Sequence, residues 1–256
     1  MSGTVVLKVG GSVLTDKNKS STAKLSEIAR MASEIRKGLS SRLVLIHGAG
    51  SFGHHQAKEF GLKNGLNGHS IKGIYPTHFA VKTLNNMIIG ELNNAGINAL
   101  PVHPLSVCTL KEGRIEHMCM DTIGQMLDAG IVPVLHGDVA MDSVKGVDIV
   151  SGDQLVVCLA RGLKAEKVGI GTNVDGVYGN DFRTISEIGP ENIGSVKEML
   201  SGSAGVDVTG GMYGKIMELM DLANNGIPSQ VFNAEKPGNI ARFLMNEKCE
   251  GTLIRG

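Results

Sequence analysis

Residues 4–11, TVVLKVGG, hold the first structural signal in the chain. Residues 4–9 are apolar or β-branched except for one lysine, a composition typical of a buried β-strand. Gly10 and Gly11 follow the strand directly, so the chain can turn sharply there or bring its backbone close to a ligand. The stretch predicts a strand of an open α/β sheet whose carboxyl end faces a binding site.

The same strand pattern recurs along the chain and alternates with segments of helical periodicity. Further strands are predicted at residues 42–46, 131–135, 167–171 and 229–232, and helices at residues 23–37, 76–94, 153–161 and 212–225. This alternation predicts an α/β fold, a three-layer αβα sandwich with a mainly parallel central sheet and helices on both faces. Residues 110–115, with Gly113 in the turn, predict a short antiparallel hairpin. No polar linker divides the chain, so we expect a single domain, residues 1–256, with lobes at about 1–165 and 166–256.

The composition excludes several classes of protein. Among 256 residues, 25 are basic and 25 acidic, and this zero net charge argues against a nucleic-acid-binding module. No run approaches the roughly 18 apolar residues of a membrane span, and the first residues lack the layout of a secretory signal. The four cysteines and eight histidines show no metal-ligand spacing, so we expect reduced thiols and no structural metal. We therefore expect a soluble, cytoplasmic protein.

Glycine is frequent, with 35 residues, and it gathers where predicted strands give way to helices. The clusters are residues 10–11 (GG), 47–54 (HGAGSFGH), 171–178 (GTNVDGVY) and 209–211 (TGG). Backbone amides at such junctions, and the helix N-termini that follow them, bind phosphate oxygens. One cluster alone is more often a tight turn, but four together predict a site for more than one phosphate group. The P-loop motif G-x-x-x-x-G-K-[ST] is absent from the sequence.

Three lysines are candidates to neutralise these phosphates. Lys8 interrupts an apolar strand, and since an unpaired buried ammonium is costly, it should face a bound anion or a buried carboxylate at the strand's end. Lys215 lies in the first turns of the helix after residues 209–211, where a cation suggests a bound anion. Lys17 stands in a polar loop, where a solvated lysine is the ordinary case. From the residues alone, the roles of Lys17 and Lys215 stay open.

Taken together and in order, these segments resemble the amino acid kinase superfamily and, within it, the isopentenyl phosphate kinases. The resemblance spans nearly the whole chain and rests on residues 8–17 (KVGGSVLTDK), 47–54 (HGAGSFGH), 151–153 (SGD), 172–178 (TNVDGVY) and 207–212 (DVTGGM). The T-D-K extension and the G-S-F-G-H loop are its most specific parts. Ala49 stands where a third glycine is common, which would narrow the acceptor's approach slightly, and Asn173 stands where aspartate is often found.

The resemblance implies ATP-dependent phosphorylation of isopentenyl phosphate, a step of isoprenoid precursor synthesis, with Mg²⁺ held mainly by the nucleotide. It implies that Lys8 and Lys17 stabilise the transferring group, that His54 binds the acceptor phosphate and that Asp153 orients the lysines. The acceptor, in the first lobe, would also contact Ala49, Gly50 and Gly152. The nucleotide, in the second lobe and at the glycine loops, would contact Lys8, Gly10, Gly11, Gly50, Thr172, Asp175, Tyr178, Gly210 and Lys215. The resemblance also implies that the chain forms a homodimer.

Acid–base chemistry agrees with a phosphate acceptor. An alcohol acceptor generally needs a base, whereas a phosphomonoester, with a second pKa of about 6, is already largely ionised near neutral pH. Its oxygen needs positioning and charge neutralisation, which lysine, histidine and backbone N–H groups supply. His54 would also suit a neutral hydrogen bond that orders its loop. For the neighbouring His55 only such a structural role is expected.

The acceptor's carbon tail needs an apolar slot. Tyr75, His78 and Phe79 follow the His54 loop in sequence, so we expect them to line this slot. Aromatic residues four positions apart are also common in core packing, and that alternative stays open.

Two other functions fit the same motifs. One is a kinase of the same superfamily that acts on a carboxylate, a carbamate or a nucleoside monophosphate. The other is a non-catalytic nucleotide or metabolite sensor on this fold. The histidine of the acceptor loop favours a phosphate over an amino-acid carboxylate, and the presence of Lys8, Lys17 and Asp153 argues against lost catalysis.

Overall fold

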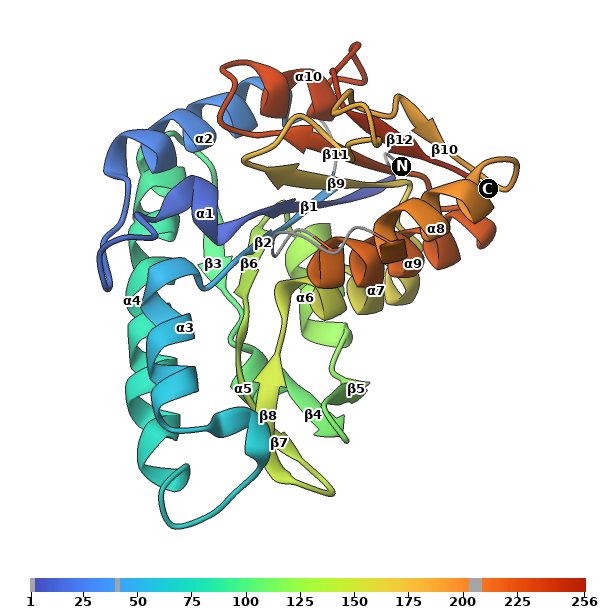
Figure 1. Ribbon diagram of the computed structural model, residues 1–256. Helices are drawn as coiled ribbons and strands as arrows, with labels where there is room; N and C mark the ends of the chain where they lie inside the picture. The colour runs from blue at the N-terminus through green and yellow to red at the C-terminus, as the bar shows by residue number, and fades with distance from the viewer. Residues whose placement is uncertain (1–2, 40–41, 203–208) are drawn as a thin grey trace.

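A computed structural model describes residues 3–39, 42–202 and 209–256 (Figure 1). In this part of the chain the large sheet has the strand order β10-β12-β11-β9-β1-β2-β6-β3. Its strands are β1 (Thr4–Val9), β2 (Arg42–His47), β3 (Ala99–Pro101), β6 (Val132–His136), β9 (Lys167–Thr172), β10 (Glu187–Ile188), β11 (Ser229–Asn233) and β12 (Thr252–Ile254). All neighbours are parallel except β11 and β12. The mainly parallel sheet is therefore confirmed, and each predicted strand ends within one residue of its observed bounds.

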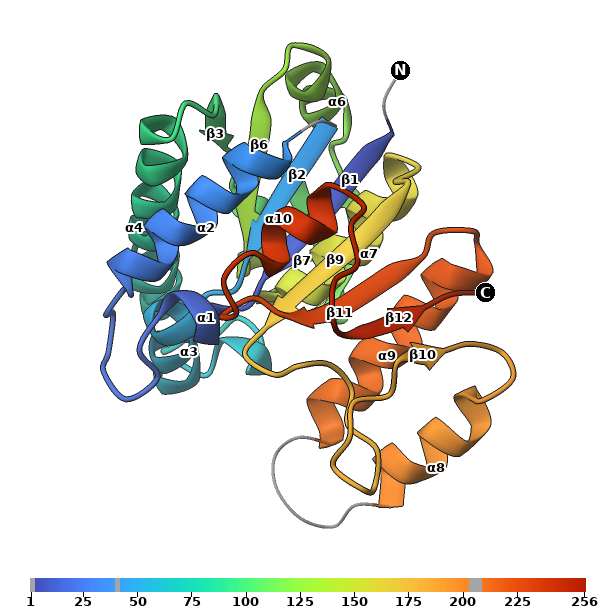
Figure 2. The same cartoon turned by 90° about the horizontal axis from the view of Figure 1, so that it is seen from above.

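Helices cover both faces of this sheet, which gives the expected three layers (Figures 1 and 2). Buried side chains of one face pack against α1 (Gly11–Leu14), α2 (Leu25–Gly38), α3 (Gly50–Glu59), α4 (Ile71–Asn94) and α10 (Asn239–Leu244). Those of the other face pack against α6 (Asp121–Asp128), α7 (Gly152–Gly162), α8 (Ile193–Gly202) and α9 (Thr209–Asn224). No helix among the described residues is long and apolar enough to cross a membrane.

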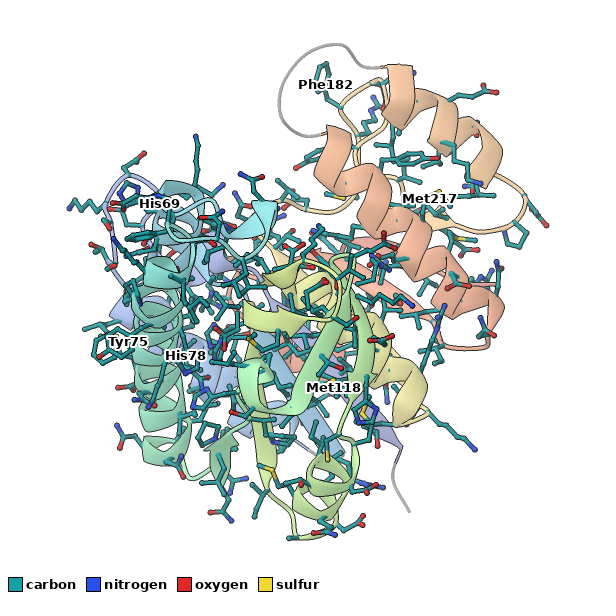
Figure 3. The ribbon with its side chains drawn as sticks, turned by 90° about the horizontal axis from the view of Figure 1, so that it is seen from below. His69, Tyr75, His78, Met118, Phe182 and Met217 are labelled. Atoms are coloured by element: carbon teal, nitrogen blue, oxygen red, sulfur yellow. The ribbon has the colours of Figure 1, made fainter. Side chains whose placement is uncertain are left out.

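The long helix α4 begins at Ile71, earlier than the predicted start at residue 76. An Asx turn starts it, because Asn67 Oδ1 accepts the N–H groups of His69 and Ser70 at 2.8 and 2.9 Å. Pro76 consequently lies inside the helix, not in its first turn. Figure 3 shows the Tyr75 side chain on the outer side of α4 and His78 on the side that faces the protein. The predicted apolar face is confirmed, since four of its residues are buried: Val81, Leu84, Ile88 and Leu92.

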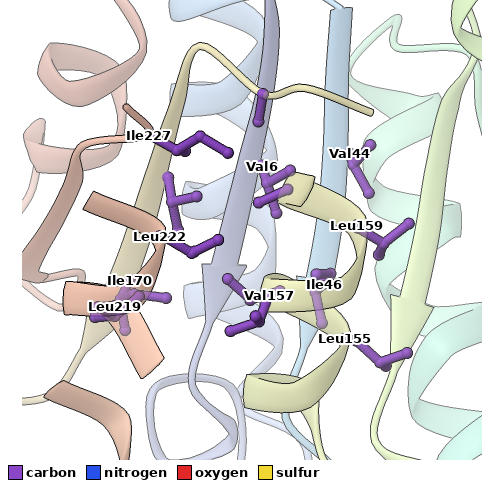
Figure 4. Close-up of a cluster of buried hydrophobic side chains, with 14 of the residues drawn as sticks. Val6, Val44, Ile46, Leu155, Val157, Leu159, Ile170, Leu219, Leu222 and Ile227 are labelled. Carbon is purple, nitrogen blue, oxygen red and sulfur yellow. The ribbon is translucent and has the colours of Figure 1, made fainter. Parts of the chain in front are cut away.

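The core is built from alternate residues of the central strands. Val5, Leu7 and Val9 of β1 belong to the cluster under α2 and α4, while Val6 points to the opposite face. Figure 4 shows that opposite cluster, in which Val6 and Ile46 meet side chains of α7 and α9. A strand buried on both faces explains why the sequence of β1 is a continuous apolar run and not an alternating one.

A second, smaller sheet with the order β5-β4-β7-β8 extends from the first lobe. Its strands are β4 (Cys108–Lys111), β5 (Arg114–Met118), β7 (Asp138–Asp142) and β8 (Gly146–Val150). The predicted hairpin is confirmed as the β4–β5 turn, where Gly113 has φ +78°. The short helix α5 (Pro104–Val107) precedes β4, and the 3₁₀ helix η1 (Leu62–Asn64) packs on β8 through Leu62 and Val147.

The register of the large sheet brings the predicted loops to one edge. Val9 pairs with His47 of β2 and with Gly171 of β9, and His47 pairs in turn with His136 of β6. The four strands therefore end side by side, and the loops that follow them meet beyond their carboxyl ends. This edge is where ligands bind in open α/β sheets.

Candidate active site

A cavity of about 630 Å³ lies beyond the carboxyl ends of β1 and β2. Its volume is in the usual range for a small-molecule site. It is lined by Lys8, Gly11, Gly48, Ala49, Gly53, His54, Ala57, Lys58, Gly61, Lys63, Asn64, Thr77, Val81, Gly137, Asp138, Ile149, Val150, Ser151, Gly152 and Asp153. The structure thus brings together six residues that the sequence singled out: Lys8, Gly11, Ala49, His54, Gly152 and Asp153.

The buried end of the cavity holds an ion pair. Lys8, only 7% exposed, donates from Nζ to Asp153 Oδ1 at 2.5 Å. Burial lowers the pKa of Lys8, while Asp153 acts in the opposite direction. Burial alone would raise the pKa of Asp153, but the charges of Lys8 and Lys215 hold it below its ordinary value, so this carboxylate is ionised. Lys8 therefore faces a carboxylate, one of the two partners predicted for it, and it also lines the cavity.

Glycines make room for this pair and for its loops. A Cβ at Gly152 would lie 3.2 Å from Lys8 Cε, so a side chain there would push the lysine from its position. A Cβ at Gly48 would lie 2.5 Å from the backbone nitrogen of Gly11, which shows that the loops after β1 and β2 touch backbone to backbone. One expectation needs correction: Gly10 donates its N–H to Gly171 O at 2.8 Å, so this amide is not free to bind a phosphate.

His54 stands at the mouth of the cavity in the first turns of α3. Gly50, with φ +52°, begins this helix, and the buried Phe52 anchors it in the core. Burial lowers the pKa of His54, and the charges of Lys63 and Lys8 lower it further. His54 is therefore mainly neutral near pH 7 and surrounded by cations, an arrangement that favours an anion between them.

The neighbour of His54 on α3 lies outside the cavity. His55 points outward, with Nε2 3.9 Å from Glu59 Oε2, and does not line the cavity.

Two further cations of the cavity wall were not predicted. Lys58 lies one helical turn after His54 on α3. Residues four positions apart share a helix face, so this spacing could have predicted that Lys58 lines the same cavity as His54. Lys63 lies in η1 and reaches the cavity only because Leu62 packs on the second sheet. No local sequence pattern marks Lys63, since its position depends on tertiary contacts.

Lys17 is exposed in the turn between α1 and α2 and does not line the cavity. The turn is tied to the site through Thr15, whose Oγ1 donates to Gly11 O at 2.8 Å and accepts the Ser51 N–H at 3.0 Å. The loop is thus anchored on the glycine loops at its first residue, while Lys17 itself extends into solvent.

The loop after β9 contains the residues expected to border the nucleoside. Asp175 Oδ1 accepts from Asn233 Nδ2 and Lys236 Nζ, each at 2.9 Å, and these bonds hold the pKa of Asp175 below its ordinary value. The Asp175 N–H lies 3.3 Å from the Tyr178 hydroxyl, and Thr172 Oγ1 accepts the Val174 N–H. The segment is an ordered carboxylate-bearing loop beside the glycine loops.

The helix α9 carries the last two predicted residues. Gly210 belongs to its first turn, whereas Asp207 and Val208 of the same motif lie outside the described residues. Lys215, one to two turns later, is near enough to lower the pKa values of Lys8 and Asp153 through its charge. The helix α9 therefore adds a third charged group, Lys215, to the surroundings of the Lys8–Asp153 pair.

The expectation that Tyr75 and Phe79 line the tail slot is wrong for this cavity. They are 72% and 55% exposed and stack on each other with ring centroids 5.7 Å apart. Figure 3 shows Tyr75 on the outer side of α4. Thr77 and Val81 line the cavity instead. Two positions along a helix rotate a side chain by roughly 200°, so the stripes 75/79 and 77/81 face opposite ways.

His78, the third residue expected at the slot, lies behind the cavity wall at the end of a row of imidazoles. It contacts His103 at a centroid distance of 5.4 Å, His103 contacts His136 at 5.3 Å, and His136 contacts His47 at 5.4 Å. Burial lowers the pKa of His47 to about 4 and that of His136 well below its ordinary value. These two rings are neutral parts of the core.

The neutral His47 predicts acid sensitivity of the fold. Its pKa in the folded state is depressed to about 4, against 6.5 when unfolded, so its contribution to stability is present above pH 6.5 and is lost as the pH falls towards 4. Urea unfolding at pH 7 and pH 5 should show a loss of about 2 kcal/mol from this residue. His47→Gln should flatten the pH dependence, and His55→Gln should not. An unchanged pH dependence in His47→Gln would contradict the assignment.

The chain was compared with known protein families. The model described as "Amino acid kinase family" matches residues 3–233. An isopentenyl phosphate kinase of Methanothermobacter thermautotrophicus is 39% identical over 266 residues, covering 98% of this chain and 99% of the relative. One of Haloferax volcanii is 42% identical over 253 residues, covering 98% of each.

The fold agrees with these sequence matches. A crystal structure described as "X-ray structures of isopentenyl phosphate kinase" superposes with a TM-score of 0.86 at 35% identity. The superposition covers 98% of this chain and all of that one, so the fold is shared over nearly the whole chain.

Proposed function

The chain belongs to the amino acid kinase family and, within it, to the isopentenyl phosphate kinases, and from this membership we propose that it transfers the γ-phosphoryl group of ATP to isopentenyl phosphate. The products are isopentenyl diphosphate and ADP. The cavity carries the proposal, because Lys8, His54 and the glycine loops converge on a space that suits a small phosphomonoester.

Transfer needs no general base in this site. A phosphomonoester is largely ionised near neutral pH, so its oxygen can attack once it is positioned and the repulsion between the two anions is reduced. Lys8 is held by Asp153 at the end of a rigid strand. Its positive charge stabilises the phosphoryl group during transfer. His54 binds the acceptor phosphate, whose negative charge favours the protonated imidazole. Ala49, Gly50 and Gly152 form the backbone around that phosphate.

The acceptor's tail would enter the apolar part of the cavity. Val81 of α4 and Ile149 and Val150 of β8 line this part. All lining residues fall between positions 8 and 153, which supports acceptor binding in the lobe of residues 1–165. This division leaves the lobe of residues 166–256 for the nucleotide.

ATP would lie across the glycine loops towards α9. In this arrangement Thr172, Asp175 and Tyr178 border the nucleoside, while Gly11, Gly210 and Lys215 face the phosphates. Among the described residues no three His, Cys, Asp or Glu side chains gather as a metal site. We propose that Mg²⁺ enters on the nucleotide phosphates, where it would neutralise charge on the transferring group.

An ATP-consumption assay against a panel of acceptors tests the proposed function. The panel contains isopentenyl phosphate, dimethylallyl phosphate, UMP, glutamate, N-acetylglutamate, aspartate and carbamate. Isopentenyl phosphate should give the highest kcat/KM, with isopentenyl diphosphate identified by mass spectrometry. A faster reaction with an amino-acid carboxylate or UMP would assign another acceptor, and ATP binding without turnover of any acceptor would favour a sensor.

A homodimer is the proposed assembly. Ile71, Tyr75 and Phe79 form an exposed stripe on α4 at spacings of four residues, 55%, 72% and 55% exposed, and such apolar patches often mark interfaces. Sedimentation should show a dimer at micromolar concentration, and the double substitution Tyr75→Lys, Phe79→Lys should make it monomeric. Phe182→Lys, at another exposed aromatic residue, is the control. A monomeric wild-type chain would contradict this proposal.

We place the enzyme in the cytoplasm. The four cysteines are free thiols, which supports a reducing compartment: Cys108, Cys119, Cys158 and Cys249.

A further inference from the structure

One hydrogen-bonded contact between a histidine and a buried aspartate joins two elements of the cavity wall. His78 Nδ1 of α4 lies 2.9 Å from Oδ2 and 3.1 Å from Oδ1 of Asp138, the first residue of β7. Thr77, next to His78 on α4, lines the cavity, and so do Gly137 and Asp138 itself. The pair therefore links the two elements that form this wall.

Among the described residues, His78 is the side chain that hydrogen-bonds the Asp138 carboxyl group. The Asp138 side chain is 0% exposed, and its other hydrogen bond comes from the Val139 N–H at 2.8 Å. Burial raises the pKa of Asp138, whereas the hydrogen bond and charge of His78 lower it. An ionised carboxylate in such a place is costly without a cationic partner.

The other groups around Asp138 do not replace His78. His136 Nδ1 of β6 lies 3.9 Å from Asp138 Oδ2, but its ring is buried and neutral, and this nitrogen lies 3.2 Å from Gly137 O. Burial also lowers the pKa of His103, whose Nδ1 lies 3.0 Å from His136 Nε2. On β4, burial raises the pKa of the nearby Cys108 thiol to about 12.

We propose that His78 is a positioning residue for the acceptor: its hydrogen bond to Asp138 holds α4 against β7 and covers a carboxyl group that lines the pocket of an anionic substrate. The proposal rests on the proposed function, since it concerns the binding of isopentenyl phosphate. His78 does not touch the substrate. Its effect reaches the acceptor through Thr77 and Val81 of the same helix and through Asp138, all of which line the cavity.

The test compares His78→Ala and His78→Gln with the double variant His78→Ala, Asp138→Asn. His78→Ala should raise the KM for isopentenyl phosphate about tenfold, because it leaves a buried carboxylate unpaired behind the acceptor. The KM for ATP and kcat should change less than about threefold. Adding Asp138→Asn removes the unpaired charge and should restore the acceptor KM to within about threefold of wild type. His117→Gln, at an exposed histidine of β5, is the matched control.

The outcomes separate this inference from the proposed function. If wild type does not phosphorylate isopentenyl phosphate, the proposed function fails first. If wild type is active but His78→Ala and His78→Gln bind the acceptor with unchanged KM, the positioning role is overturned. Failure of Asp138→Asn to improve the acceptor KM also overturns it, because a merely structural loss would not be rescued by a second substitution. Should His78→Ala not fold, His78→Gln with and without Asp138→Asn gives the same comparison.

Discussion

Replacing Lys8 by methionine is expected to lower kcat about a thousandfold, the loss typical when a preorganised electrostatic contact to the transition state is removed. The methionine side chain keeps much of the volume of Lys8 but carries no charge. Asp153, which holds Lys8 at 2.5 Å, would then face the transferring group as an uncompensated anion. ATP affinity should change far less than kcat, because the charge matters most during transfer. Steady-state kinetics with both substrates varied measures the two effects separately.

Lys111→Met provides the control for this substitution, since Lys111 is an exposed lysine of β4 outside the cavity. A kcat of Lys8→Met within tenfold of wild type would contradict the assigned role. The same kinetics applied to Lys17→Ala test the second motif lysine. A large loss of kcat there would mean that the exposed turn moves over the bound substrates, whereas an unchanged kcat would leave Lys17 as a solvated loop residue.

Replacing His54 by alanine is expected to lower kcat/KM for isopentenyl phosphate by roughly ten- to a hundredfold, or 1.5–3 kcal/mol for a charge-assisted hydrogen bond. The charges of Lys63 and Lys8 both act on the imidazole, and an acceptor phosphate bound among these three residues would favour the protonated form of His54. The effect should appear with the acceptor varied and not with ATP varied. It should also be accompanied by weaker acceptor binding in calorimetry without nucleotide.

His55→Ala is the matched control for His54→Ala, because the two histidines are adjacent on α3 and His55 points to solvent. An acceptor kcat/KM in His54→Ala equal to that of His55→Ala would contradict phosphate binding by His54. Its role would then be the ordering of the loop that begins α3.

The central strands could be predicted because each is buried on both faces and forms a continuous apolar run. The strands β7 and β8 were missed, since their sequences DVAMD and GVDIV include aspartates that interrupt any such run. Those aspartates are held by local bonds, for example Asp142, which accepts the N–H groups of Val144 and Lys145. The early start of α4 depends on an Asx turn at Asn67 within a segment that has no helical periodicity.

In the site, the predicted residues that line the cavity are those that follow strands in sequence. Lys8 lies in β1 and His54 follows β2, so the parallel register of these two strands brings them together. Asp153 follows β8 of the second sheet, and it meets Lys8 through tertiary packing of α7 on β1 and β2. Lys63 and Asp138 reach the cavity through tertiary packing. Two aromatic residues four positions apart do not show which side of α4 faces the cavity. For this reason the positions of Tyr75 and Phe79 were predicted wrongly.

The account depends on cations and backbone amides at one sheet edge holding two anionic substrates together. A crystal structure with isopentenyl phosphate and a non-hydrolysable ATP analogue tests this most directly. We predict the acceptor phosphate within hydrogen-bonding distance of His54, with Lys8 Nζ beside the γ-phosphate and the tail against Val81 and Ile149. An acceptor bound outside this cavity, or a γ-phosphate far from Lys8, would contradict it.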